Sequence, residues 1–160
     1  MHMQTSATTR STRRGDVGAT WSRVAAFASA VDASLDRWLA DNHRVGLTEF
    51  RALTFVSQAS DKELRINDLA QRVGLNQSSA TRLVSRLEAK DYVRRDLCQD
   101  DGRGVYAVIT EQGEALLGDV QAPYEERIGE LLSATSAHLP GTDVAQLKRA
   151  MRDIEAMLSA

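Results

Sequence analysis

The chain has 160 residues, 42% of them hydrophobic, and its 20 basic and 22 acidic residues give a formal net charge of −2. This length suits one domain with its own core, and the charge balance excludes a polycation that coats nucleic acid through net charge, though not a local basic face. A single cysteine, Cys98, excludes a disulfide framework, and the two prolines and 5% aromatic residues favour helices over a β-sandwich.

The N-terminal residues 1–18 are polar, basic and rich in Ser and Thr, without the apolar stretch of a signal peptide. We expect them to form a mobile arm. Its arginines (Arg10, Arg13 and Arg14) are able to touch phosphate, but a solvated tail is the interpretation that we favour. No apolar run approaches the roughly 20 residues of a transmembrane helix, so we expect a soluble, cytoplasmic protein.

Apolar residues recur at steps of three and four along three stretches, which predicts three amphipathic helices. The first covers residues 19–41. The second follows Thr110, a natural cap, and contains Pro123, which we expect to kink or split it. The third follows Thr142, another natural cap, and runs through residue 158.

Three shorter helices are expected between the first two of these long ones. Thr48 is predicted to cap one of them, which ends before a polar turn at residues 60–63. Asn67 is predicted to cap the next, which ends at Gly74. Asn76 is predicted to cap a further helix that runs to about residue 90.

The hydrophobic period then changes to that of strands. Residues 92–97 and 105–109 are short β-type runs on either side of a segment rich in turn formers, which predicts a two-stranded hairpin. A hairpin of this size needs neighbouring helices for stability. The expected fold is therefore mainly α with a small β-hairpin, in the order α-α-α-α-β-β-α-α.

Residues 66–87 fit the helix-turn-helix pattern. Ala70 is small where two helices must approach closely, Gly74 stands where the turn needs a left-handed backbone, and Ala80 and Leu83 supply shared core. The alternative is an ordinary helical hairpin with no role in DNA binding.

The side of the second helix opposite this core is polar and cationic. It collects Ser78, Arg82, Ser85 and Ala89, with Thr81 and Arg86 beside them. Residues 71–95 hold six basic and two acidic side chains, whereas residues 111–140 hold one basic and six acidic ones. Small hydroxyls and arginines suit a DNA groove, and the basic face beside an acidic body is not what a random solvated helix predicts.

The tip of the hairpin offers a second contact. Arg103 stands between two glycines, Gly102 and Gly104, which permit a narrow tip that enters a minor groove. Asp101 is well placed to orient that guanidinium. The alternative is a turn with a surface ion pair of little energetic value.

These features together resemble the MarR family of winged helix-turn-helix regulators. The resemblance is carried by residues 66–75 (INDLAQRVGL), 79–90 (SATRLVSRLEAK), 91–95 (DYVRR) and 100–113 (DDGRGVYAVITEQG), and Asp91 departs from the glycine often found there. It implies a homodimer that binds a pseudo-palindromic operator in double-stranded DNA. Residues 47–110 would form the winged helix-turn-helix lobe, and residues 19–46 and 111–160 an α-helical dimerisation layer.

The resemblance also implies roles for single residues. Those expected to face bases are Gln77, Ser78, Thr81 and Arg82. Arg86 would face the DNA backbone, and Arg103, beside Asp101, would be the wing-tip arginine. We therefore expect a sequence-specific regulator, in the first instance a repressor released by a small-molecule effector.

A small aromatic or lipophilic effector would need a pocket with a cationic anchor. Trp38, His43, Arg44 and Phe50 are candidates for it, although packing and solvated charge explain them equally simply and are the interpretation that we favour. Cys98, near Arg94 and Arg95, makes a redox-sensing regulator an alternative, against an unreactive spare thiol.

An enzyme is disfavoured, because the three histidines (His2, His43 and His138) share no ligand spacing and no phosphate loop or catalytic triad appears. No cofactor or metal is expected. The remaining alternative is a helical protein-interaction module that borrows the fold without binding DNA, and it predicts no need for Arg82 or Arg103.

Overall fold

A computed structural model describes residues 15–97, 104–138 and 144–159. Its elements, in chain order, are α1 (Gly15–His43), α2 (Leu47–Gln58), a 3₁₀ turn (Ser60–Lys62), β1 (Glu63–Arg65), α3 (Ile66–Val73), α4 (Gln77–Ala89), β2 (Val93–Leu97), β3 (Val105–Ile109), α5 (Glu111–His138) and α6 (Val144–Leu158). The mainly helical fold with a small sheet is confirmed. Several residues that were given a role in the sequence predictions lie outside the described ranges, namely residues 1–14, Cys98, Asp101, Arg103 and Thr142.

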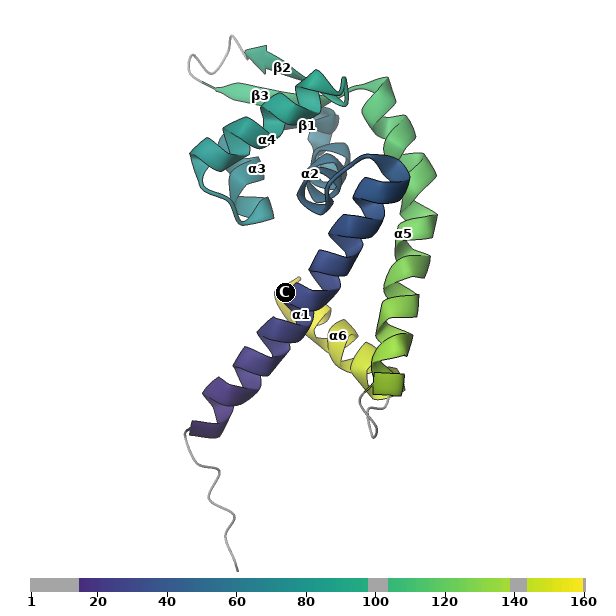
Figure 1. Ribbon diagram of the computed structural model, residues 1–160. Helices are drawn as coiled ribbons and strands as arrows, with labels where there is room; N and C mark the ends of the chain where they lie inside the picture. The colour runs from purple at the N-terminus through teal and green to yellow at the C-terminus, as the bar shows by residue number, and fades with distance from the viewer. Residues whose placement is uncertain (1–14, 98–103, 139–143, 160) are drawn as a thin grey trace, which may run out of the picture.

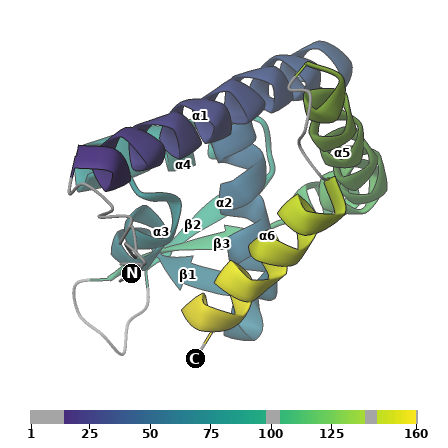
Figure 2. The ribbon, with the colours of Figure 1, turned by 90° about the horizontal axis from the view of Figure 1, so that it is seen from below.

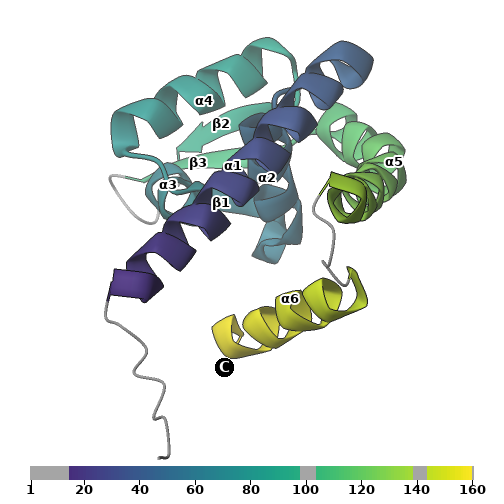
Figure 3. The same cartoon turned by 60° about the horizontal axis from the view of Figure 1, so that its bottom comes forward.

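The elements divide into a lobe and a set of long helices (Figure 1). Helices α2, α3 and α4 and the sheet form the lobe, while α1 and α5 meet beside α2 and diverge as they extend away from the lobe. Helix α6 turns back from the far end of α5 and lies apart from α1 (Figures 2 and 3). Among the described residues, no helix has both the length and the apolar character needed to cross a bilayer.

Two buried clusters hold these parts together. The lobe cluster joins α2, α3, α4 and the sheet through side chains such as Leu53, Leu69, Leu83 and Val93, all of them fully or nearly fully buried. The second cluster joins α1, α2 and α5, and it is built from Leu35, Leu39, Val45, Leu47, Phe50 and Val120. Helix α2 contributes to both clusters, so it connects the lobe to the long helices.

The sheet has three antiparallel strands in the order β1-β3-β2. The prediction of a two-stranded hairpin was therefore incomplete, since β1 pairs Glu63 with Val108 in the segment expected to be a turn. The strand contains one buried residue, Leu64, and three residues are too few to show a period of two in the sequence. β1 gives β3 a partner on each side and ties the hairpin to the start of α3.

Two predicted helix caps were wrong. Helix α2 begins after Gly46, not Thr48, because Glu49 accepts a hydrogen bond from Gly46 N and Asp36 accepts one from Leu47 N, at 3.1 and 2.8 Å. Helix α3 begins at Ile66, immediately after the last paired residue of β1, so Asn67 lies inside it.

Two other caps were predicted correctly. Asn76 Oδ1 accepts a hydrogen bond from Ser79 N at 2.8 Å, and Thr110 Oγ1 accepts one from Gly113 N at 3.1 Å. Helix α5 continues through Pro123 without being split. Helix α1 begins at Gly15, four residues before the predicted start at Ala19.

Asp91 occupies the position where the resemblance led us to expect glycine. Its φ is +62°, in the left-handed region that glycine enters without steric cost and that Asp tolerates better than most residues. Its carbonyl oxygen accepts a hydrogen bond of 2.6 Å from Thr110 Oγ1, which holds this turn against the start of α5. The departure from glycine is therefore accommodated without a change of fold.

Candidate nucleic-acid interface

The turn between α3 and α4 sets the angle between the two helices. Gly74 has a φ of +71°, and its N–H and that of Leu75 donate to Gln71 O and Ala70 O at 3.2 and 2.9 Å. These bonds satisfy the last carbonyls of α3 and turn the chain sharply into α4. Ala70 is nearly buried at the crossing, as the motif predicted.

Helix α4 has one buried side and one exposed side. Ala80, Leu83, Val84 and Leu87 are completely buried in the lobe. The exposed side, here called the reading face, consists of Gln77, Ser78, Thr81, Arg82, Ser85 and Arg86. The predicted division of this helix is thus confirmed, and the reading face carries short hydroxyls and two guanidinium groups at the surface of the lobe.

Hydrogen bonds order the start of the reading face. Ser78 Oγ donates to Asn76 Oδ1 at 2.9 Å, and Thr81 Oγ1 donates to Gln77 O, also at 2.9 Å. Arg82 Nη2 lies 3.4 Å from Ser79 Oγ on the preceding turn. These side chains are held along the helix, which lowers the entropy that is lost when they meet a ligand.

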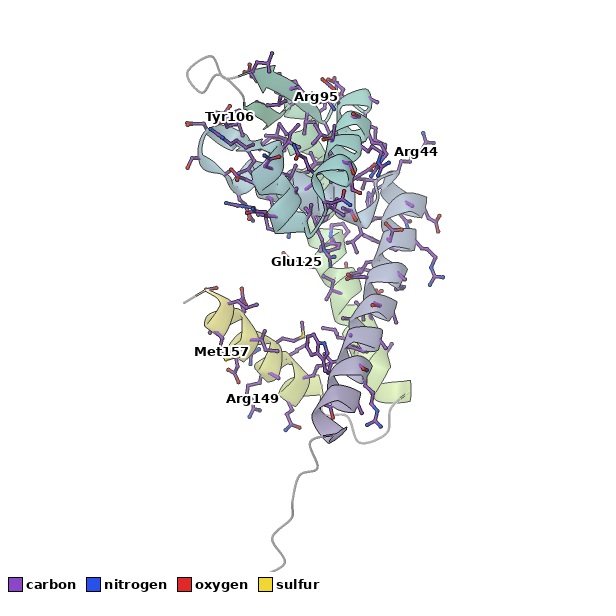
Figure 4. The ribbon with its side chains drawn as sticks, turned by 90° about the vertical axis from the view of Figure 1, so that its left-hand side faces the viewer. Arg44, Arg95, Tyr106, Glu125, Arg149 and Met157 are labelled. Atoms are coloured by element: carbon purple, nitrogen blue, oxygen red, sulfur yellow. The ribbon has the colours of Figure 1, made fainter. Side chains whose placement is uncertain are left out.

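Arg95 on β2 contacts the reading face, and it was not among the residues predicted for the site. Its Nη2 donates to Ser85 Oγ at 2.6 Å and to Thr81 O at 3.3 Å, and its Nη1 lies 3.4 Å from a carboxylate oxygen of Glu88. Figure 4 shows Arg95 where β2 passes α4. Alternation along a strand places Arg94 and Arg95 on opposite faces, but the sequence alone does not say which face meets α4.

A hollow of about 330 Å³ lies between the starts of α3 and α4 and strand β3. Its lining includes Arg65, Asn67, Gln77, Thr81 and Arg95. Arg65 is held there by Tyr106, because its Nε donates to the Tyr106 hydroxyl at 2.9 Å and its guanidinium stands 5.6 Å from the centre of that ring. Two guanidinium groups, two amides and a hydroxyl around one hollow suit an oxygen-rich anion such as a phosphodiester.

Arg86, which was predicted to face the DNA backbone, also contacts a buried carboxylate. Its Nε lies 3.3 Å from Oε1 of Glu49, whose other oxygen, Oε2, accepts a hydrogen bond of 2.7 Å from Lys90 Nζ. Burial by itself raises the pKa of the Glu49 carboxyl, but the hydrogen bonds from Lys90, Gly46 and Arg86 outweigh it. The pKa therefore lies below its ordinary value, and Glu49 is a charged group inside the protein.

The four predicted effector-pocket residues have different surroundings in the structure. Trp38 and His43 make an edge-to-face ring contact with centroids 5.0 Å apart, and Phe50 is buried against Tyr124 with centroids 4.6 Å apart. Arg44 is exposed (Figure 4). A separate hollow of about 200 Å³ is lined by Phe50, Arg51, Thr54, Phe55, Gln121 and Tyr124, so only Phe50 of the predicted set reaches it.

Comparison with known proteins gives consistent matches. A model described as the MarR family matches residues 45–104. The transcriptional regulator MhqR of Bacillus subtilis is 31% identical over 109 residues, which cover 67% of this chain and 74% of MhqR.

Among solved structures, the MarR-family regulator Sco3205 of Streptomyces coelicolor, crystallised in complex with DNA, superposes with a TM-score of 0.73 at 19% identity, covering 96% of this chain and 91% of that one. NadR, crystallised in complex with 4-hydroxyphenylacetate, superposes with a TM-score of 0.57 at 21% identity, covering 98% and 97%. At these identities the two structures support the fold, while MhqR carries the relationship in sequence.

Proposed function

Because this chain belongs to the MarR family of DNA-binding transcriptional regulators, and not to a family of enzymes, we propose that it acts as a homodimer on a pseudo-palindromic operator. Each copy would place α4 in one of two successive major grooves, about one helical turn apart. Repression would follow from occlusion of promoter elements in the cytoplasm. The observation that carries the proposal is the reading face, polar and cationic on a helix whose other side is fully buried.

We assign base contacts to Gln77, Ser78, Thr81 and Arg82 because they are exposed near the start of α4. The first residues of a recognition helix are the ones that approach base edges most closely. Arginine donates two hydrogen bonds to the guanine edge, and glutamine pairs with adenine in the same way. Asp101 and Arg103 keep their proposed role at the wing tip, where Arg103 would enter the minor groove.

We assign phosphate contacts to Arg65 and Arg95. Both line the hollow beside the reading face, and both are oriented by neighbours, Arg65 by Tyr106 and Arg95 by Ser85. A preordered guanidinium loses less entropy on binding a phosphate than one that moves freely. These contacts would position the lobe on the duplex without selecting its sequence.

A homodimer is supported by apolar side chains that the single chain leaves in solvent. On α6, Ile154, Met157 and Leu158 are exposed, Leu158 by 84%, and on α1 Trp21 and Val24 are exposed, Trp21 by 68%. Exposed apolar groups gathered on long helices are typical of subunit interfaces. We propose residues 19–46 and 111–160 as the dimerisation layer and residues 47–110 as the DNA-binding lobe.

Release by an effector rests on the region where α1, α2 and α5 meet. Phe50 and Arg51 line the hollow of about 200 Å³ between α2 and α5, and Phe50 shares a hydrophobic cluster with Trp38 of α1. His43 is the last residue of α1, and Arg44 follows it. We propose that a small aromatic or lipophilic acid binds in this region. Its binding would change the separation of the two recognition helices and so weaken the fit to DNA.

The proposal is tested by fluorescence anisotropy with the DNA upstream of the protein's own gene, at two salt concentrations. Arg82→Ala is expected to weaken binding by about five- to a hundredfold, the range of a lost bidentate base contact. Arg37→Ala, which removes the same charge from the exposed surface of α1, is the matched control and should bind as wild type. If Arg82→Ala and Arg37→Ala bind alike, α4 does not read DNA, and a protein-interaction module becomes the better explanation.

A further inference from the structure

A buried carboxylate lies next to residues 44–46, the segment between α1 and α2 that is here called the α1–α2 joint. Glu49 is 6% exposed, and its side chain is surrounded by hydrogen-bond donors from two parts of the chain. Gly46 N donates to it from the joint itself at 3.1 Å, while Lys90 Nζ and Arg86 Nε reach it from the end of α4 at 2.7 and 3.3 Å. One side chain therefore connects the α1–α2 joint to the last turn of α4.

The same end of α4 is also bonded to the chain just after α1. Lys90 Nζ donates to the carbonyl oxygen of Arg44 at 3.1 Å, and Arg44 has a φ of +55°, so the backbone turns sharply at this point. Asp36, on the last part of α1, accepts a hydrogen bond from Leu47 N. Hydrogen bonds thus connect the α1–α2 joint and the start of α2 to α1 on one side and to the end of α4 on the other.

We infer that Glu49 is a positioning residue, which fixes the direction of α4 relative to α1 by bonding Arg86 and Lys90. The inference rests on the proposed function, in which α1 belongs to the dimerisation layer and α4 reads DNA. Under this inference Arg86 supports the lobe through Glu49 and is not primarily a phosphate contact.

The length of α4 explains why the hydrogen bonds of Glu49 at its C-terminal end affect the position of its N-terminal end. The 13 residues of α4 span about 20 Å at 1.5 Å per residue, with Glu49 bound at the last turn and Gln77 and Ser78 at the first. A small rotation about the anchored end moves the base-facing end by several times more than it moves Arg86. In a dimer this displacement occurs in both copies of α4, so the fit to both major grooves changes.

Electrostatics and positioning predict opposite effects on DNA affinity when the carboxylate of Glu49 is removed. Removing a negative charge beside a DNA-binding helix strengthens binding if charge alone acts. Removing Glu49 instead releases Arg86 and Lys90 from their shared partner and frees the joint. Glu49→Gln keeps the shape of the side chain, so it separates the two effects.

The test measures operator affinity by anisotropy for Glu49→Gln, Arg86→Ala and the double variant. We expect Glu49→Gln to weaken binding by about tenfold, within the range of residues that modulate coupling between sites. The double variant should bind no more weakly than Glu49→Gln alone, because both changes break one connection. Asp61→Asn, an exposed carboxylate of the 3₁₀ turn that lies outside the proposed dimerisation layer and off α4, is the control and should bind as wild type or slightly tighter.

A second measurement reports directly on the relative position of the two copies of α4. Nitroxide labels on Ser78→Cys, in a Cys98→Ser background, report the distance between the two copies of α4 in the free dimer. Glu49→Gln should broaden or shift this distribution while circular dichroism stays unchanged, and Glu49→Asp, with its shorter reach, should act in the same direction.

Unchanged or tighter binding of Glu49→Gln with an unchanged distance distribution would overturn the inference. So would an Arg86→Ala variant that lowers the salt dependence by about one phosphate contact while Glu49→Gln has no effect. The proposed function itself is judged separately by Arg82→Ala, so a failure here leaves that result standing.

Discussion

Glu49 is the one buried charged side chain among the described residues. A carboxylate without water needs several donors, and Glu49 has Lys90, Gly46 and Arg86. The fold brings Arg86 and Lys90 to Glu49 from about 40 residues along the chain, and the bond from Gly46 forms with the start of α2. The carboxylate form is therefore stabilised in the folded state more than in the unfolded one.

This difference makes a prediction about pH. The pKa of Glu49 is lowered in the folded protein, so its contribution to stability is complete above the unfolded pKa of about 4.3 and is lost as the pH falls through the folded value. Wild type should exceed Glu49→Gln in free energy of unfolding at pH 7, and the gap should shrink below about pH 4.5. Urea unfolding between pH 7 and pH 3 measures it, and a gap that stays constant or widens in acid would contradict the prediction.

Single residues were predictable where their chemistry acts locally. Asn76 caps α4 because the bond to Ser79 spans three residues, and Gly74 adopts the left-handed backbone that its turn requires. Thr48 and Asn67 were equally good caps by composition. They lost that role because Asp36 and Glu49 bind the start of α2, and because β1 pairing extends to the residue before α3.

At the scale of elements, the sheet and α5 meet at one crowded junction. Thr110 N donates to Tyr92 O at 3.1 Å, which ties the start of α5 to the turn before β2. Gly113 lies directly over this contact, and a Cβ there would collide with the Tyr92 carbonyl and the Ile109 side chain. The direction of the sheet relative to α5 therefore depends on the missing side chain at residue 113.

We predict that Gly113→Ala destabilises the protein by about 1–3 kcal/mol, as overpacking of a tight contact usually does. It should also weaken operator binding, because the displaced residues lead directly into β2. Gly118→Ala is the matched control on the same helix. A Cβ there meets nothing within 4 Å, so we expect a gain of up to about 1 kcal/mol from higher helix propensity. Thermal unfolding compares the two, and equal effects would show that the junction is not tight.

The hydrophobic periodicity of the sequence predicted some helices and strands but not all of them. Periodicity predicted the long helices and the two strands β2 and β3, since each repeats its pattern over at least five residues. It did not find β1, whose three residues become a strand only by pairing with β3. For Pro123 the sequence predicted a kink or a split, and the continuous α5 excludes only the split.

At the scale of the whole molecule, the described chain leaves apolar side chains exposed on two of its helices. The cluster between α1, α2 and α5 covers only the end of α1 nearest the lobe, through Leu35 and Leu39. The apolar residues of the other end, Trp21 and Val24, remain exposed, as do those of α6. The repeat of three and four in these helices is thus longer than the described chain buries, and in the proposed homodimer a second copy would cover the exposed apolar surface.

We therefore predict that Ile154→Asp, on the exposed side of α6, converts a dimer into single chains, because it puts a charge into a surface that must lose its water. Sedimentation velocity at micromolar concentrations measures the change. Leu97→Asp is the matched control, since Leu97 is an apolar residue 71% exposed at the end of β2, outside the proposed dimerisation layer. It should remain a dimer.

The same variant links assembly to DNA binding. A dimer binds its second half-site at a high effective concentration, so single chains should lose operator affinity by about a hundredfold or more although the reading face is intact. A short duplex that contains one half-site separates the two effects, because Ile154→Asp and wild type should bind it equally. If wild type sediments as single chains, or if Ile154→Asp keeps full affinity for the complete operator, then two joined copies of α4 are not what recognises the DNA.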